Sequence, residues 1–138
     1  MNAHSSHEPW VIHLGELDQK MGIRVLEQSA ERVVTTMPVQ GNTQSLGRLH
    51  GGASAALAEA TGSWAAMIHA SVRGKVCVGV DLNITHHRGA KDGEITATAT
   101  PLHAGSRIAT YQVLITDQSG KLLATARITN MLMDPKEH

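Results

Sequence analysis

The segment from Gly52 to about Val72 constrains the fold most, because it has the apolar spacing of a long helix but few large side chains. Its apolar residues recur at intervals of three and four, which predicts one buried stripe: Leu57, Ala60, Trp64, Met67 and Ile68. A glycine inside a helix costs about 1 kcal/mol relative to alanine, so a composition this rich in small residues needs a structural reason. We expect a sheet wrapped closely around this helix, where small side chains let the backbones approach.

Strand-like segments flank the helix on both sides. Before it, residues 15–22 are typical of a short helix or turn closed by a glycine, and residues 23–39 of a hairpin that turns at "QSAER". After it, we expect four strands in a meander: 74–88, 93–103, 106–117 and 121–133. The order predicts an α+β domain, with an antiparallel sheet around one long central helix.

The first of these four strands, 74–88, shows the clearest alternation. Alternate residues are expected to share one face: Val76, Val78, Val80, Leu82, Ile84, His86 and Arg88. Adjacent His86 and His87 then point to opposite faces. No histidine pair has metal-ligand spacing with a nearby carboxylate, so no metal site is predicted despite nine histidines.

Composition excludes several classes of function. A length of 138 residues indicates one domain, and equal numbers of basic and acidic residues, 12 each, give no net field for nucleic acid or an anionic membrane. Only Trp10, Trp64 and Tyr111 are aromatic, which is few for stacking on bases. A core without phenylalanine is thin, and this suggests that a partner subunit completes it.

The sequence also bears on location. The single cysteine, Cys77, cannot form an internal disulfide, and no apolar run approaches the roughly 20 residues that span a bilayer. The first residues lack the pattern of a secretory signal. We therefore expect a cytoplasmic protein without a membrane segment.

The residues able to take part in catalysis cluster in the first half of the helix and just before it. Gly51 and Gly52 leave backbone amides open at the positive end of the helix dipole, which suits an oxyanion receptor or, more simply, a tight helix entry. Glu59 is either a desolvated catalytic carboxylate or a solvated surface residue, and Ser63 follows it at i+4, within reach of it or of a water. His50 either orients a substrate carbonyl or caps the helix.

Four blocks of sequence together resemble one family: "GRLHGGASAALAEATGS", "NTQSLGRLHGG", "DLNITHHR" and "PLHAGSR". They are similar to the hotdog-fold acyl-CoA thioesterases, in particular the group with the Arthrobacter-type 4-hydroxybenzoyl-CoA, phenylacetate-pathway and 1,4-dihydroxy-2-naphthoyl-CoA enzymes. The resemblance implies a single hotdog domain over residues 1–138, with an ordered core at about 13–133. It also implies hydrolysis of an acyl-CoA, with an aromatic acyl group favoured.

The resemblance assigns roles to individual residues. Gln44 positions the thioester or the water, Gly51 donates its amide to the thioester oxygen, and Glu59 acts as general base or as nucleophile through an anhydride. Ser63 steadies the water and His86 supports the site, with His50 beside it. The resemblance places coenzyme A near a further set: Arg88, Gly105, Ser106 and Arg107. Gly52, Trp64 and Met67 complete the expected substrate-binding residues, while His87 has no assigned role.

The family resemblance further implies dimers joined edge to edge through their sheets, usually paired into tetramers, with sites between subunits and no dissociable cofactor. Two other functions stay open. One is a hotdog-fold hydratase or dehydratase that acts on an acyl thioester through a loop histidine and a helix acid, which His50 and Glu59 imitate. The other is an acyl-CoA-binding module without catalysis.

Overall fold

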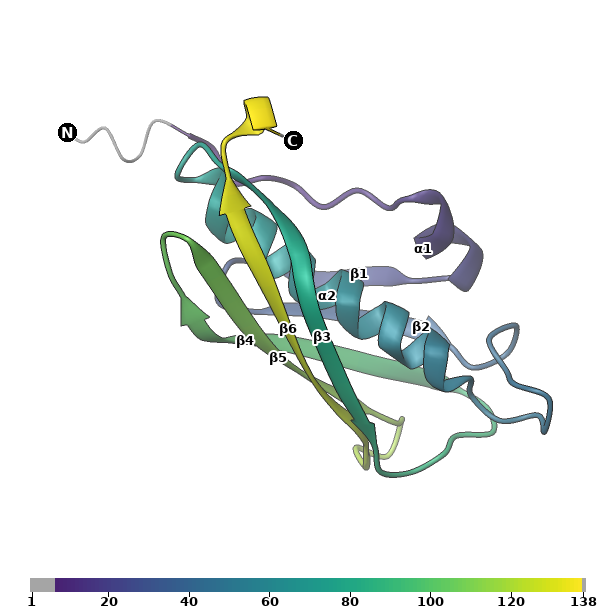
Figure 1. Cartoon of the computed structure of the whole chain (residues 1–138). Coiled ribbons are helices and arrows are strands. Elements are labelled where there is room, and N and C mark those ends of the chain that lie inside the picture. Colours follow the sequence, from purple (N-terminus) through teal and green to yellow (C-terminus); the bar gives the residue numbers. More distant parts are fainter. Residues whose placement is uncertain (1–6, 138) are drawn as a thin grey trace.

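A six-stranded antiparallel sheet curves around one long helix in the computed structural model, which describes residues 7–137 (Figure 1). In chain order the elements are α1 (Glu16–Met21), β1 (Arg24–Gln28), β2 (Val33–Pro38), α2 (Gly51–Ser71), β3 (Val76–His86), β4 (Glu94–Ala104), β5 (Ile108–Thr116), β6 (Leu122–Met133) and a short 3-10 helix, η2 (Pro135–Glu137). Helix α2 packs against β2, β3, β4, β5 and β6. The α+β hotdog arrangement predicted from the sequence is confirmed.

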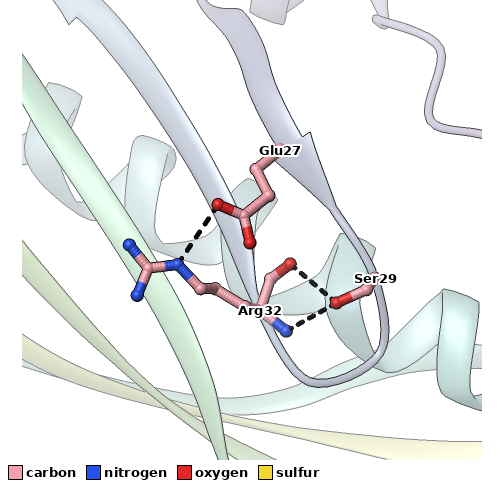
Figure 2. Close-up of polar contacts among 3 residues, drawn as sticks. All are labelled: Glu27, Ser29 and Arg32. Carbon is pink, nitrogen blue, oxygen red and sulfur yellow. Dashed lines mark hydrogen bonds and ion pairs between the residues drawn. The ribbon is translucent and has the colours of Figure 1, made fainter.

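The hairpin predicted at "QSAER" forms the turn between β1 and β2 (Figure 2). The Ser29 hydroxyl donates to the carbonyl of Arg32 at 3.2 Å and accepts from its amide at 3.0 Å. Arg32 Nε lies 3.3 Å from Glu27 Oε1, and both side chains are half exposed to solvent. An exposed pair of this kind contributes about 0–1 kcal/mol, so the turn geometry rather than the charge holds the hairpin.

The predicted four-strand meander is wrong at its first strand. The sheet order is β1-β2-β4-β5-β6-β3, so β4, β5 and β6 are consecutive neighbours, whereas β3 pairs with β6 and β4 pairs with β2. Alternation within a strand reports which face is buried and carries no information about its partner. In the observed order β3 is an edge strand. The chain after β3 crosses the sheet to form β4 between β2 and β5.

The small residues of α2 have the use that the composition indicated. Leu57, Ala58 and Ala65 are fully buried against the sheet. A Cβ atom at Gly62 would collide with the side chain of Ile128 on β6 and lie 3.2 Å from Val113 Cγ2 on β5. Any larger residue at Gly62 would push the helix away from the sheet.

A β-bulge changes the face that β3 presents. Cys77 and Gly79 lie opposite the buried Leu132 and Asn130 of β6, and the register then shifts between Gly79 and Asp81. Beyond the shift, three β3 residues lie opposite buried positions of β6: Leu82, Ile84 and His86. Residues opposite one another in an antiparallel pair share a face. The predicted single face from Val76 to His86 is therefore wrong, because the extra residue at the bulge reverses the alternation.

Candidate active site

The first turn of α2 leaves one amide without an acceptor. The amide of Gly52 donates to Nδ1 of His50 at 2.8 Å, and the amides of Ala53 and Ser54 donate to the His50 carbonyl. No residue within 7–137 accepts a hydrogen bond from the amide of Gly51. His50 is thus the N-cap of the helix, the simpler of its two predicted roles. The Gly52 amide is already engaged, so Gly51 is the available donor.

The loop before the helix is organised around Gln44. Its side-chain oxygen accepts from the amides of Leu46 at 2.6 Å and Arg48 at 3.2 Å. Its backbone amide donates to the carbonyl of Arg48, and its carbonyl accepts from Gly47. These bonds fix the side chain and leave its NH2 group without a described partner, ready to donate to a ligand.

A cavity of about 360 Å³ joins these donors to the end of β3. It is lined by Gln44, Leu49, Gly51, Ser54, His86, His87, Arg88, Gly89 and Leu123. Nε2 of His86 lies 3.1 Å from the position that a Cβ of Gly51 would occupy, so the imidazole and the open amide adjoin. The structure therefore brings together the predicted residues Gln44, Gly51, His86 and Arg88.

Cations without acidic partners lie at this cavity. Arg88 lines it, and Cδ of Arg48 lies 3.5 Å from the Cβ position of Gly89, another lining residue. Neither arginine forms an ion pair with any residue in the described part of the chain. Exposed guanidinium groups of this kind suit phosphate. His87 had no role assigned from the sequence. Its Nε2 forms a hydrogen bond of 3.0 Å with Thr125 Oγ1.

Glu59 lies outside this cavity, on the third turn of α2. Eight residues separate it from Gly51, which is roughly 12 Å along the helix. Its side chain is half buried and reaches β3, where a Cβ at Gly79 would lie 2.5 Å from its Oε2. Within residues 7–137 the carboxylate has no hydrogen-bond or ion-pair partner. Among the described residues, only packing contacts, such as that with Gly79, fix the position of the carboxylate.

The loop predicted to meet coenzyme A lies at the opposite end of α2. Gly105, Ser106 and Arg107 form the turn between β4 and β5 (Figure 1). The carbonyl of Gly105 bonds Nε2 of His69 at 2.7 Å, near the C-terminus of the helix. In one chain this turn therefore does not meet the cavity at Gly51.

Two residues that were predicted to bind substrate, Trp64 and Met67, do not line the cavity. Trp64 is 8% exposed and belongs to the hydrophobic core, as one of its two interpretations held. Met67 is half buried on α2 and lies outside the cavity. The predicted stripe is thus only partly buried: Leu57, Trp64 and Ile68 lie in the core, whereas Ala60 and Met67 are half buried.

Asn130 on β6 was missed by sequence reasoning. Its side chain is completely buried, and Nδ2 donates to the Ser63 hydroxyl at 3.1 Å. A buried amide oxygen without a partner costs about 1–3 kcal/mol, and Oδ1 of Asn130 has none among the described residues. The signal was present: alternation through Ala124, Ala126 and Ile128 assigns Asn130 to the buried face.

Cys77 lies in the same region but is unsuited to nucleophilic chemistry. Its Sγ lies 3.9 Å from the Ser63 carbonyl, and burial raises the pKa of the thiol to about 11. The thiol is therefore protonated at neutral pH, and the thiolate is the nucleophilic form.

Comparison with known proteins places this fold and site in a family. The thioesterase superfamily model matches residues 46–124. The proofreading thioesterase EntH of Cronobacter turicensis is 35% identical over 121 residues, which are 87% of this chain and 88% of that protein. The chain belongs to the thioesterase superfamily.

Solved structures of thioesterases support the same family assignment. A thioesterase, HI1161 from Haemophilus influenzae, superposes with a TM-score of 0.81 and 35% identity over 88% of this chain and 85% of that chain. Thioesterase superfamily member 2 from zebra fish superposes with a TM-score of 0.74 and 37% identity over 80% and 81%. The chain is accordingly a thioester hydrolase that acts on acyl thioesters. None of the helices described within residues 7–137 has the length and apolar character to cross a membrane.

Proposed function

We propose that this protein hydrolyses an acyl-CoA, with an aromatic acyl group favoured, at a site assembled from two chains in the cytoplasm. The observation that carries the proposal is the Gly51 amide, which is free at a helix N-terminus, adjoins His86 and opens on a cavity that Gln44 also lines. Donors aimed at a developing oxyanion stabilise the transition state of acyl transfer. A thioester carbonyl in the cavity would accept from Gly51 while Gln44 and His86 orient it.

Distance argues for the second chain. An oxyanion donor and an attacking group both lie within roughly 3–3.5 Å of the reacting atoms. Gly51 and Glu59 of one chain are roughly 12 Å apart along a rigid helix, so they cannot serve one carbonyl. Strand β3 has an open edge, with Val80 exposed to 55%, and Glu59 lies against this strand. Two sheets joined there would carry Glu59 of one chain toward the cavity of the other.

The reaction follows from these positions. The Glu59 carboxylate takes a proton from water as the water oxygen adds to the thioester carbonyl carbon, or it attacks that carbon itself and expels the coenzyme A thiolate, which forms an anhydride that water then cleaves. The oxyanion rests on the Gly51 amide, and the carbon–sulfur bond breaks to release coenzyme A. Arg88 binds a phosphate of coenzyme A, and the turn of Gly105, Ser106 and Arg107 contributes from a neighbouring chain. No dissociable cofactor or metal takes part, and dimers pair into tetramers.

The structure gives the hydratase function less support. It would use a loop histidine as catalyst, yet Nδ1 of His50 is engaged in the helix cap. Hydrolysis leaves that cap intact and uses the amide beside it.

A turnover screen tests the proposal. A panel of aryl and aliphatic CoA esters is incubated with the protein, and free thiol is measured beside loss of enoyl absorbance. We expect thiol release, fastest with aryl esters. The Glu59→Gln variant should lower kcat by about 10²- to 10⁴-fold while it still binds coenzyme A and assembles normally. Tight binding without thiol release would identify a binding module, and enoyl loss without thiol release a hydratase.

A further inference from the structure

Asn130 is the one polar side chain among the β6 residues that face α2. The other inward positions are Ala124, Ala126, Ile128 and Leu132. An asparagine here is fully buried, with a single hydrogen bond to Ser63 and its Oδ1 unsatisfied among the described residues. The packing of the core does not need this group, since an apolar residue of the same shape would remove the unsatisfied oxygen.

The Ser63 hydroxyl differs from the hydroxyls of Thr61 and Ser71 on the same helix. Thr61 donates to the carbonyl of Leu57 at 2.7 Å and Ser71 to that of Ile68 at 2.8 Å, so their protons are held by the helix backbone. Ser63 accepts from Asn130, and its own proton goes to no residue in the described part of the chain. The Ser63 proton is thus not committed to any described group.

Glu59 is the one carboxylate on α2. It precedes Ser63 by four residues, so the two side chains adjoin on one helix face. Gly79, which pairs with Asn130 across β3 and β6, lies directly against the Glu59 carboxylate. Asn130, Ser63, Gly79 and Glu59 thus form one continuous cluster across three elements.

We propose that Asn130 is a positioning residue for the hydrolysis proposed above, on which this inference rests. By donating to Ser63, it orients the hydroxyl so that the Ser63 proton points toward Glu59 and the water that Glu59 activates. Asn130 touches neither substrate nor water. It acts through Ser63, which would otherwise turn its proton back to the helix carbonyl, as Thr61 does.

A double-mutant cycle tests this role. Asn130→Leu, Ser63→Ala and the double variant are compared for kcat and KM on the best substrate of the panel. We expect each single change to lower kcat about tenfold or more, a part of the roughly 10²–10⁴ that positioned proton transfer contributes, with KM nearly unchanged. The double variant should be no slower than Ser63→Ala alone, because Asn130 acts only through Ser63.

Two measurements separate this role from a merely structural one. Thr36→Val on β2 removes the other buried polar atom without a described partner, a hydroxyl oxygen, and should leave kcat unchanged. In nuclear magnetic resonance spectra the Asn130 side-chain NH2 signals should exchange slowly and shift in Ser63→Ala, whether or not turnover is measured. Losses that multiply in the double variant, or NH2 signals unaffected by Ser63→Ala, overturn the role of Asn130 alone. A wild-type protein that hydrolyses no ester of the panel overturns the proposed function, while the NH2 signals still report the hydrogen bond.

Discussion

The two ends of α2 treat their polar groups in opposite ways. At the C-terminal end, His69 bonds the Gly105 carbonyl through Nε2 and meets Arg73 Nη1 at 3.1 Å through Nδ1, and Arg73 also donates to the His69 carbonyl. In the first three turns, the amide of Gly51 and the carboxylate of Glu59 have no partner among the described residues. Satisfied groups stabilise a fold, whereas groups kept free are available to a substrate. We call the C-terminal end of α2, with its satisfied groups, the structural end, and the first three turns, where the proposed reaction takes place, the chemical end.

Apart from Glu59→Gln, the largest effect should come from removing the free amide at the chemical end. Gly51→Pro removes the free N–H while keeping the helix, because proline is favoured at the first helical position and His50 already has the extended conformation that precedes proline, with φ −70° and ψ 128°. We expect kcat to fall by about 10²- to 10³-fold with little change in Tm. Gly51→Ala, which keeps the amide and adds the same Cβ beside His86, is the matched control. Equal losses in both variants would show that space, not the amide, matters.

A smaller loss should follow from moving the carboxylate. In Gly79→Ala the new Cβ would lie 2.5 Å from Glu59 Oε2, so the side chain must shift. A misplacement of about 1 Å can cost up to about 10²-fold in rate, and we expect a loss in kcat within that range. Shortening the acid should relieve the collision, so Gly79→Ala combined with Glu59→Asp should lose less than the product of the two single losses. A multiplicative loss would mean that the two side chains do not touch.

At the structural end, stability should change and rate should not. His69→Leu leaves the Gly105 carbonyl without its donor, and we expect the free energy of unfolding to fall by about 1–3 kcal/mol. Chemical denaturation at neutral pH measures this. At saturating substrate and well below the unfolding temperature, kcat should match the wild type, and any change should be in KM, because the Gly105 turn belongs to the proposed coenzyme A site. A fall in kcat at unchanged stability would place chemistry at this end as well.

The smallest effect on stability concerns Cys77 on β3, beside the middle of α2, and it appears only at alkaline pH. Burial raises the pKa of the Cys77 thiol from 9.0 to about 11, so the unfolded chain ionises first as pH rises. The contribution of the buried neutral thiol to stability is complete below about pH 9 and is lost as pH approaches 11. Cys77→Ala should therefore lose less stability than the wild type between pH 7 and pH 10, as denaturation curves at the two values will show. Parallel losses would mean that the thiol is accessible when folded.

Much of the local structure could be predicted from residues close together in the sequence. The spacing of Leu57, Trp64 and Ile68 placed α2, and "QSAER" placed the hairpin. The pair of glycines predicted open amides at the helix start, although the pair alone did not show that His50 would engage one amide and leave the other. Gln44 came only from the family resemblance. Trp64 shows the limit of such reasoning, because a core residue and a pocket residue have the same spacing.

The sequence by itself determined the kinds of elements and their order, because periodicity and turn preferences act over a few neighbouring residues. The candidate catalytic groups came from the family resemblance, since local patterns left their roles open. Only the tertiary structure decided that β3 lies at the sheet edge beside β6, that a bulge at Val80 reverses its faces, and that Asn130 meets Ser63 from 67 positions away. Strand pairing and register depend on contacts between residues far apart in the chain, which no local pattern encodes. The separation of Gly51 from Glu59, by contrast, follows from their spacing along one helix, and it is this separation that makes a second chain necessary for the proposed reaction.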